Sequence, residues 1–235
     1  MTGALPLMIF AAGFGRRMGD LTAHRPKPLI KVGQKTLLEC AHEIGATAGC
    51  EPIAVNAHYL APQIIEAATK LGCKVSAESD HILDTGGGLK NALPLVPGPA
   101  ILTLNPDAVW SGPNPLTQLI QHGLPDHLDA VLLLVERQRA IARIEPGDFS
   151  QDASGQLNRK GAFVYTGAQI IRRSLAKSVS DDVFSMNRLW DLAIEKGRLG
   201  GITYSGEWCD VGRPEGITIA EKLLSQSELE DRGKS

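Results

Sequence analysis

Apolar runs alternate with helical patterns along the first half of this chain, and this alternation constrains the fold more than any other feature. The uninterrupted apolar run LPLMIFAA, residues 5–12, precedes a helical pattern at residues 35–49. The same order recurs at residues 51–57 and 61–72, then at 73–78 and 86–96, before a further apolar run at 100–105. Strands and helices in this order predict βαβ units, and uninterrupted apolar strands are typical of a sheet buried on both faces. We therefore predict an α/β fold, with a mainly parallel mixed sheet and helices on both faces.

The second half of the chain is less regular. Long apolar runs predict strands at residues 128–138 and 161–171, and residues 184–197 have helical spacing. The remaining expected elements are a strand, turn and strand end at 201–216 and a closing helix at 217–226. Since no internal repeat or linker interrupts the chain, we expect one domain over residues 1–235. Residues 226–235 are expected to form a flexible tail.

Composition and charge exclude several classes of protein. The 235-residue chain has 43% hydrophobic residues and a net charge of −2, so no general electrostatic attraction to nucleic acid or to an anionic membrane is expected. No apolar run reaches the roughly 20 residues of a membrane span. Basic residues follow the first apolar stretch instead of preceding it, which is the wrong order for a secretion signal. The four cysteines are scattered, so we expect free thiols and a cytoplasmic location.

A glycine turn follows the first predicted strand. Gly13 and Gly15 match the start of a dinucleotide fingerprint, but Met18 occupies the position where its third glycine is needed. The Walker A pattern also fails, because no Gly-Lys-Ser/Thr follows. What remains is a turn whose backbone N–H groups can bind phosphate oxygens, with the guanidinium of Arg17 beside it.

A lysine on a stiff segment follows this turn. Lys27 lies between Pro26 and Pro28, which restrict the backbone to an extended conformation. Taken singly, Arg17 could form a surface salt bridge and Lys27 could point to water, as charged residues mostly do. Together, after a first strand, they predict an oligophosphate site.

These segments resemble those of a known family. AAGFGRRM followed by PKPLI is similar to the signature of the sugar-1-phosphate nucleotidyltransferases, A-A-G-x-G-x-R-M and then P-K-P-[LM]. The resemblance covers about residues 7–225. The segments DTGGGLKNALPLV and WCDVGRPEG resemble the short bacterial N-acetylmuramate-1-phosphate uridylyltransferases, which lack the C-terminal β-helix of longer relatives.

The resemblance implies both a fold and a reaction. The fold would be a Rossmann-like nucleotidyltransferase fold without a β-helix. The reaction would join a sugar-1-phosphate, with N-acetylmuramate-1-phosphate as the best guess, to a nucleoside triphosphate, with UTP as the best guess. Its products would be a nucleotide-sugar and pyrophosphate, with Mg²⁺ as cofactor and a role in cell-wall sugar recycling. The implied nucleotide-binding residues here are Ala12, Gly13, Gly15, Arg17 and Lys27.

Two aspartates follow strand-like segments. Asp107 lies just beyond the run at residues 100–105, and Asp210 lies in an apolar, glycine-rich strand end. Either could be a turn or N-cap aspartate, and Asp210 could cap a helix that begins near Pro214. As a pair they would suit Mg²⁺, which prefers one or two carboxylates together with phosphates and water. The resemblance implies this metal pair, although Pro106 replaces the small residue that usually precedes the first aspartate.

Further site residues are expected on the base and sugar sides. Gly86 and Gly87 would let a nucleotide base approach the backbone, while Asp84 or Thr85 could cap the helix that begins there. The resemblance implies that Asn105, Asp148, Thr166 and Gly167 contact the sugar substrate.

The proposed chemistry needs no general base, and the sequence shows no motif that would supply one. A phosphate monoester has a second pKa of about 6, so the attacking phosphate needs no general base, and no Ser-His-Asp or Cys-His arrangement is evident. Arg17, Lys27, Asp107 and Asp210 are therefore the expected catalytic residues, acting by positioning and electrostatics. The alternatives are a nicotinamide-dependent dehydrogenase, a non-catalytic nucleotide-sugar sensor, or a transferase for another sugar phosphate with GTP, dTTP or CTP. The sequence does not determine the oligomeric state.

Overall fold

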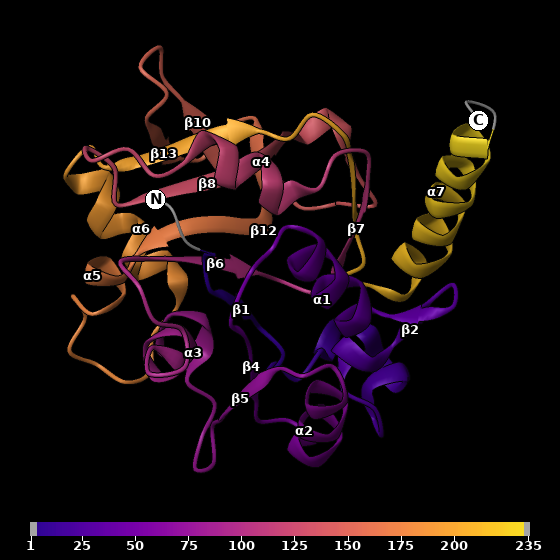
Figure 1. Cartoon of the computed structure of the whole chain (residues 1–235). Coiled ribbons are helices and arrows are strands. Elements are labelled where there is room, and N and C mark those ends of the chain that lie inside the picture. The colour runs from indigo at the N-terminus through magenta and orange to yellow at the C-terminus, as the bar shows by residue number, and fades with distance from the viewer. Residues whose placement is uncertain (1–3, 233–235) are drawn as a thin grey trace.

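The computed structural model describes residues 4–232, and its centre is a nine-stranded sheet (Figure 1). The strand β1 (Leu7–Ile9) pairs in parallel with β4 (Ile53–Ala57) and with β6 (Ala100–Leu104), and β4 pairs in parallel with β5 (Lys74–Ala77). These four strands match the apolar runs of the first half. The predicted parallel part of the sheet is confirmed.

The second half of the chain adds strands of mixed direction to this sheet. The long strand β12 (Phe163–Arg172) runs antiparallel to both β6 and β8 (Ala130–Glu136). The strand β13 (Leu199–Thr203) pairs in parallel with β8, and the short strands β10 (Phe149–Gln151) and β11 (Leu157–Arg159) extend the sheet beyond β12. The sheet is therefore mixed, as predicted.

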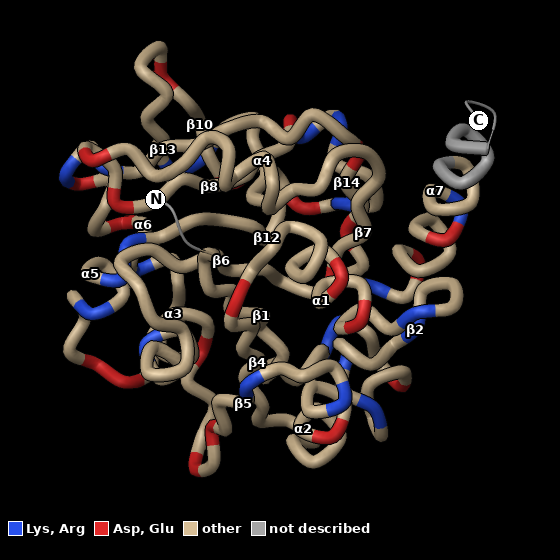
Figure 2. Tube along the Cα trace, in the orientation of Figure 1, with Lys and Arg blue, Asp and Glu red and all other residues tan. Residues whose placement is uncertain are grey.

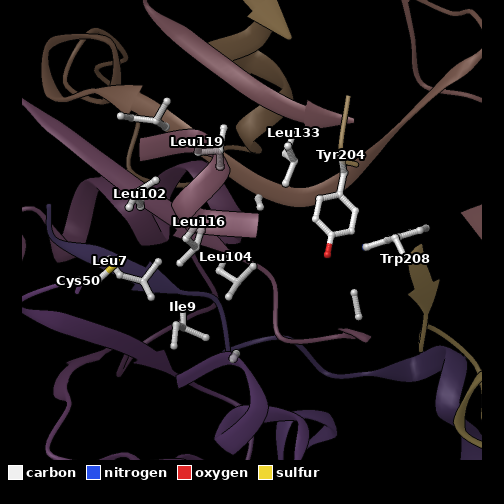
Figure 3. Close-up of a cluster of buried hydrophobic side chains, with 14 of the residues drawn as sticks. Leu7, Ile9, Cys50, Leu102, Leu104, Leu116, Leu119, Leu133, Tyr204 and Trp208 are labelled. Atoms are coloured by element: carbon white, nitrogen blue, oxygen red, sulfur yellow. The ribbon is translucent and has the colours of Figure 1, made fainter. Parts of the chain in front are cut away.

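Helices cover both faces of the sheet. One layer contains α1 (Leu37–Thr47), α2 (Ala61–Lys70) and α4 (Pro115–His122), and the other contains α3 (Asp84–Ala92), α5 (Arg173–Ala176) and α6 (Met186–Glu195). Successive side chains of a strand point to opposite faces. Leu7 and Ile9 accordingly pack in the first layer, shown in Figure 3, while Met8 packs in the second.

A small separate sheet was not predicted as such. The strand β14 (Glu207–Asp210) pairs antiparallel with β7 (Ala108–Ser111) and parallel with β9 (Ala140–Ile141). The remaining short elements are the 3₁₀ helices η1 (Arg16–Thr22), η2 (Lys27–Leu29) and η3 (Arg137–Arg139) and the two-residue strands β2 (Lys31–Val32) and β3 (Lys35–Thr36).

The C-terminal helix is longer than predicted. The helix α7 (Pro214–Arg232) continues through most of the segment expected to be a tail, and in Figure 1 it extends away from the sheet. The segment SELEDR contains no glycine or proline to end a helix, which explains the longer element. Residues 233–235 of the expected tail lie outside the described residues. Within residues 4–232, no helix has the length and apolar character to cross a membrane.

Candidate active site

The larger of two neighbouring cavities opens where β1 ends. It has a volume of about 690 Å³. Its lining contains all five of the predicted nucleotide-binding residues of the glycine turn and the lysine segment, namely Ala12, Gly13, Gly15, Arg17 and Lys27. Positively and negatively charged residues are interspersed along the Cα trace (Figure 2), so an anion bound here depends on this local group of cations.

The glycine turn has the backbone shape that the motif requires. Gly15 has a φ of 65°, and a Cβ atom there would lie 2.9 Å from Cβ of Lys27. The Gly15 carbonyl accepts a hydrogen bond from the Met18 amide at 2.8 Å, which closes the first turn of η1. A Cβ atom at Gly13, in contrast, would meet no atom within 4 Å. Gly15 therefore packs against the lysine segment, while the backbone at Gly13 is left open to the cavity.

The pairing of β7 with β14 brings the two aspartates together. Ala108 lies opposite Asp210, and the amide of Val211 donates to the carbonyl oxygen of Asp107 at 2.9 Å. Nζ of Lys27 lies 2.6 Å from Oδ2 of Asp107. The predicted catalytic residues thus converge from segments about a hundred residues apart in the chain.

The environments of the two carboxylates differ. Burial acts to raise the pKa of Asp107, but the charge and hydrogen bond of Lys27, helped by Arg17, hold the pKa of that carboxyl below its ordinary value. Burial raises the pKa of Asp210, and the negative charge of Asp107 raises it further. One carboxylate is therefore held ionised while its neighbour is crowded by like charge, and a divalent cation between them would relieve that repulsion.

The donor set fits Mg²⁺ better than a softer metal. Both aspartates supply oxygen, and among the described residues no group of three or more His, Cys, Asp or Glu side chains could hold a metal ion. Two carboxylates without a complete protein cage correspond to the way Mg²⁺ is usually bound, with substrate phosphates and water completing its shell.

The smaller cavity, of about 230 Å³, adjoins the aspartates. All four predicted sugar-side residues line it: Asn105, Asp148, Thr166 and Gly167. The two cavities share three lining residues, Arg17, Asn105 and Asp107. A molecule in one cavity can therefore meet a molecule in the other beside Asp107.

Two of the predicted sugar-side residues are held by hydrogen bonds within the protein. Gly167 has a φ of 93°, and its carbonyl accepts a hydrogen bond from the Asn105 amide at 2.9 Å. The buried hydroxyl of Thr166 donates to the carbonyl of Leu133 at 2.7 Å, while the Thr166 carbonyl accepts from the Trp208 indole at 2.9 Å. The Thr166 hydroxyl is thus engaged within the protein.

Asp148 positions its neighbours. One of its carboxylate oxygens accepts from the Tyr165 amide at 2.9 Å, and the other lies 3.2 Å from Nη2 of Arg143. Nη1 of Arg143 also lies 3.9 Å from Oδ2 of Asp210. Asp148 therefore orients an arginine toward the carboxylate pair.

The sequence reading did not identify Arg143 or its partner Glu145. Glu145 forms salt bridges with Arg17 at 3.3 Å, with Arg143 at 3.5 Å and with Arg213 at 3.2 Å. A backbone hydrogen bond, Arg213 and the neighbouring arginines lower the pKa of Glu145, against the effect of burial. These residues lie in an irregular connection without a motif, so no local signal indicated them.

The expected role of Gly86 and Gly87 in binding the nucleotide stays a prediction. Within the described chain neither glycine lines either cavity, whereas Asp84 and Thr85 line the larger one. A Cβ atom at Gly86 would overlap the Phe184 ring, and one at Gly87 would overlap the carbonyl oxygen of Asp182. These glycines let α3 pack closely against residues 182–184.

The start of α3 differs from expectation, because neither Asp84 nor Thr85 caps the helix. The N-cap position is Leu83, whose amide donates to Oε2 of Glu78 at 2.9 Å. Oε1 of Glu78 accepts from Asn56 at 2.7 Å, and Oδ1 of Asn56 accepts from the Ala11 amide at 2.7 Å. This buried chain of hydrogen bonds links the loop before α3 to the end of β1, and both of its side chains line the larger cavity.

Comparison with known proteins gives consistent matches. The family model described as the MobA-like NTP transferase domain matches residues 7–182. The chain is 29% identical to an N-acetylmuramate alpha-1-phosphate uridylyltransferase of Caulobacter vibrioides, over 94% of this chain and 97% of that protein. It is 31% identical to a protein of the same name in Neisseria meningitidis serogroup B, over 87% and 92%. The crystal structure of HddC from Yersinia pseudotuberculosis complexed with GMP-PN shares the fold, with a TM-score of 0.74, 21% identity, and coverage of 94% of this chain and 99% of that chain.

Proposed function

The chain belongs to the MobA-like NTP transferase domain family and is a sugar-1-phosphate nucleotidyltransferase, and we propose that its substrates are UTP and N-acetylmuramate-1-phosphate. The observation that carries the proposal is the pair of cavities that meet at Arg17, Asn105 and Asp107. The names of the two uridylyltransferase relatives support this choice of substrates. Cell-wall sugar recycling and a cytoplasmic location are parts of the same proposal.

The reaction forms one phosphorus–oxygen bond and breaks another. A phosphate oxygen of the sugar-1-phosphate attacks the α-phosphorus of UTP, the bond between the α- and β-phosphates breaks, and pyrophosphate leaves. The attacking phosphate is already mostly dianionic at neutral pH, because its second pKa is about 6, so no side chain has to remove a proton. Catalysis then depends on alignment and on stabilising the charge of the leaving group.

We assign the triphosphate to the larger cavity and the sugar phosphate to the smaller one. Backbone amides at Gly13 and the guanidinium of Arg17 would bind phosphate oxygens, and the ammonium of Lys27 would stabilise the departing pyrophosphate. Asp107 and Asp210 would hold Mg²⁺, which when bound supplies positive charge to the phosphate groups that meet there. Arg143 faces the same place from the sugar side.

A screen for pyrophosphate release tests the proposal. UTP, GTP, dTTP and CTP are each combined with N-acetylmuramate-1-phosphate, N-acetylglucosamine-1-phosphate, mannose-1-phosphate and glucose-1-phosphate, with Mg²⁺ and with EDTA. We expect the highest kcat/KM for UTP with N-acetylmuramate-1-phosphate, and loss of activity in EDTA. A higher kcat/KM for another pair would refute the proposed substrates. No release with any pair would favour the non-catalytic sensor.

A further inference from the structure

Arg159 supplies a cation to the smaller cavity that the reaction described above does not use. It lies at the end of β11 and lines the cavity together with Tyr165 and Trp190. Its guanidinium carbon lies 5.0 Å from the ring centroid of Phe149 and 5.4 Å from that of Trp190. The side chain is only 32% exposed, so this charge is partly shielded from water by aromatic rings.

The helix α6 fixes the orientation of this guanidinium. Nε donates to Oδ1 of Asp191 at 2.7 Å, and Nη2 donates to the carbonyl oxygen of Asn187 at 2.8 Å. A guanidinium has five N–H groups in a rigid planar fork. Within the described residues, the Arg159 side chain donates these two hydrogen bonds and no others. Its remaining N–H groups are therefore left for a ligand.

Arg159 has a different ion-pair partner from the arginines around the aspartates. Arg143 and Arg17 are tied by ion pairs to carboxylates beside the shared part of the cavities. Arg159 has its ion pair with Asp191 instead, on α6. The smaller cavity therefore has two distinct positive groups, one beside Asp107 and Asp210 and one on the wall formed with α6.

These two groups have different uses for a sugar phosphate. The phosphate must lie beside Asp107, where the two cavities meet, because only there can it reach the nucleotide. With the phosphate in that position, the sugar ring would extend along the aromatic wall of Tyr165 and Trp190, and a substituent of the ring would lie near Arg159. A preoriented guanidinium in a partly dehydrated wall matches a carboxylate, which it can bind through two parallel hydrogen bonds.

We propose that Arg159 binds a carboxylate carried by the sugar and thereby selects acidic sugar-1-phosphates over neutral ones. The proposal rests on the proposed function for the position of the phosphate. It makes Arg159 a specificity-determining residue, which binds the substrate away from the reacting phosphates.

The test compares two ligands that differ in one acidic substituent, N-acetylmuramate-1-phosphate and N-acetylglucosamine-1-phosphate. Their dissociation constants are measured by calorimetry, with a non-hydrolysable UTP analogue present, for the wild type, Arg159→Gln and Arg159→Lys. Arg198→Gln is the matched control, because Arg198 also forms a partly exposed ion pair, with Asp129, but does not line the cavity. Thermal unfolding of each variant checks that it is folded.

We expect the wild type to bind N-acetylmuramate-1-phosphate more tightly than N-acetylglucosamine-1-phosphate. Arg159→Gln should weaken binding of the acidic ligand by about tenfold or more, the usual effect of losing a charge-assisted hydrogen bond, and leave the neutral ligand almost unaffected. Arg159→Lys keeps the charge but loses the planar fork, so its loss should be smaller. If Arg159→Gln does not fold, Arg159→Lys carries the test, since a selective loss for the acidic ligand is expected there too.

Three results would overturn the proposal. They are equal weakening of both ligands in the Arg159 variants, unchanged binding of both, or a wild type that binds the neutral ligand as tightly as the acidic one. None of these would remove the nucleotidyltransferase function, which pyrophosphate release measures separately. Conversely, selective loss of the acidic ligand without turnover of any substrate pair would sustain the role of Arg159 and refute the proposed reaction.

Discussion

The two cavities are built in different ways. The larger one lies at the carboxyl end of a parallel strand, and the glycine turn forms part of its lining. The smaller one is lined by residues from the antiparallel part of the sheet, from α6 and from an irregular connection, including Arg159, Trp190 and Arg143 respectively. A backbone cradle suits the triphosphate, which all nucleotide substrates share, whereas a lining of side chains can distinguish one sugar from another. The comparison predicts that substitutions will act on one substrate, on the other, or on both.

The largest effect is expected where the two cavities meet. Lys27→Ala should lower kcat by about 10²–10³, the usual cost of removing one preorganised electrostatic group. Lys27 is the contact that most lowers the pKa of Asp107 against the effect of burial. The pKa of Asp107 should therefore rise in the variant, and the acidic limb of the kcat profile should move to higher pH. Steady-state kinetics across the pH range measure both effects.

Lys31→Ala provides the matched control, because Lys31 is an exposed lysine on β2 and lines neither cavity. Its kcat and pH profile should match those of the wild type. A Lys27→Ala enzyme with near wild-type turnover would contradict the role given to this lysine.

A smaller effect, confined to one substrate, is expected at Arg143. Arg143→Gln removes the cation between Asp148 and Asp210, so the KM for the sugar phosphate should rise about tenfold, in line with a charge-assisted hydrogen bond. The KM for UTP should not change. Arg139→Gln, in the exposed turn η3, controls for loss of positive charge nearby. Equal increases in both KM values would show that the cavities do not act separately.

The difference between the two cavities also explains which features could be predicted from the sequence. The turn around Gly13 and Gly15 and the strands of the first half are encoded in consecutive residues, so periodicity and turn chemistry identify them. The approach of Asp107 to Asp210 depends on strand pairing between distant segments. Here the family resemblance, and not local spacing, brought the two residues together.

The sugar side was predicted less completely for a related reason. The strands β10 and β11 have three residues each, too few to show a period. They form through pairing, since β10 pairs with β12 and β11 pairs with β10. Arg143 and Arg159 belong to no motif, and most arginines lie on the surface, so sequence alone gave no reason to select them. Their partners are distributed over connections and α6.

A substitution at Gly87 tests whether this glycine contacts the nucleotide or only lets α3 pack closely. Gly87→Ala should reduce stability by about 1–3 kcal/mol, because its methyl group would overlap the carbonyl of Asp182. At a temperature where the variant is folded, its KM for UTP should not change. Gly13→Ala is the matched opposite: the new methyl group meets no protein atom, so the melting temperature should not change while the KM for UTP rises. Thermal melts and UTP kinetics distinguish the two variants, and a higher KM for Gly87→Ala without loss of stability would support a contact between Gly87 and the nucleotide.

The smallest effect is expected at Asn114, which links α4 to α1. Its Oδ1 caps α4 by accepting from the Leu116 and Thr117 amides at 2.9 and 3.1 Å, and its Nδ2 donates to the Ile44 carbonyl of α1 at 2.8 Å. Asn114→Ala should cost about 1 kcal/mol in the free energy of unfolding. Asn114→Ser keeps a capping oxygen but cannot reach α1, so denaturant unfolding of both variants separates the cap from the link. Asn114 lines neither cavity, so both KM values should be unchanged; a change in either would mean that helix packing couples the two substrate sites.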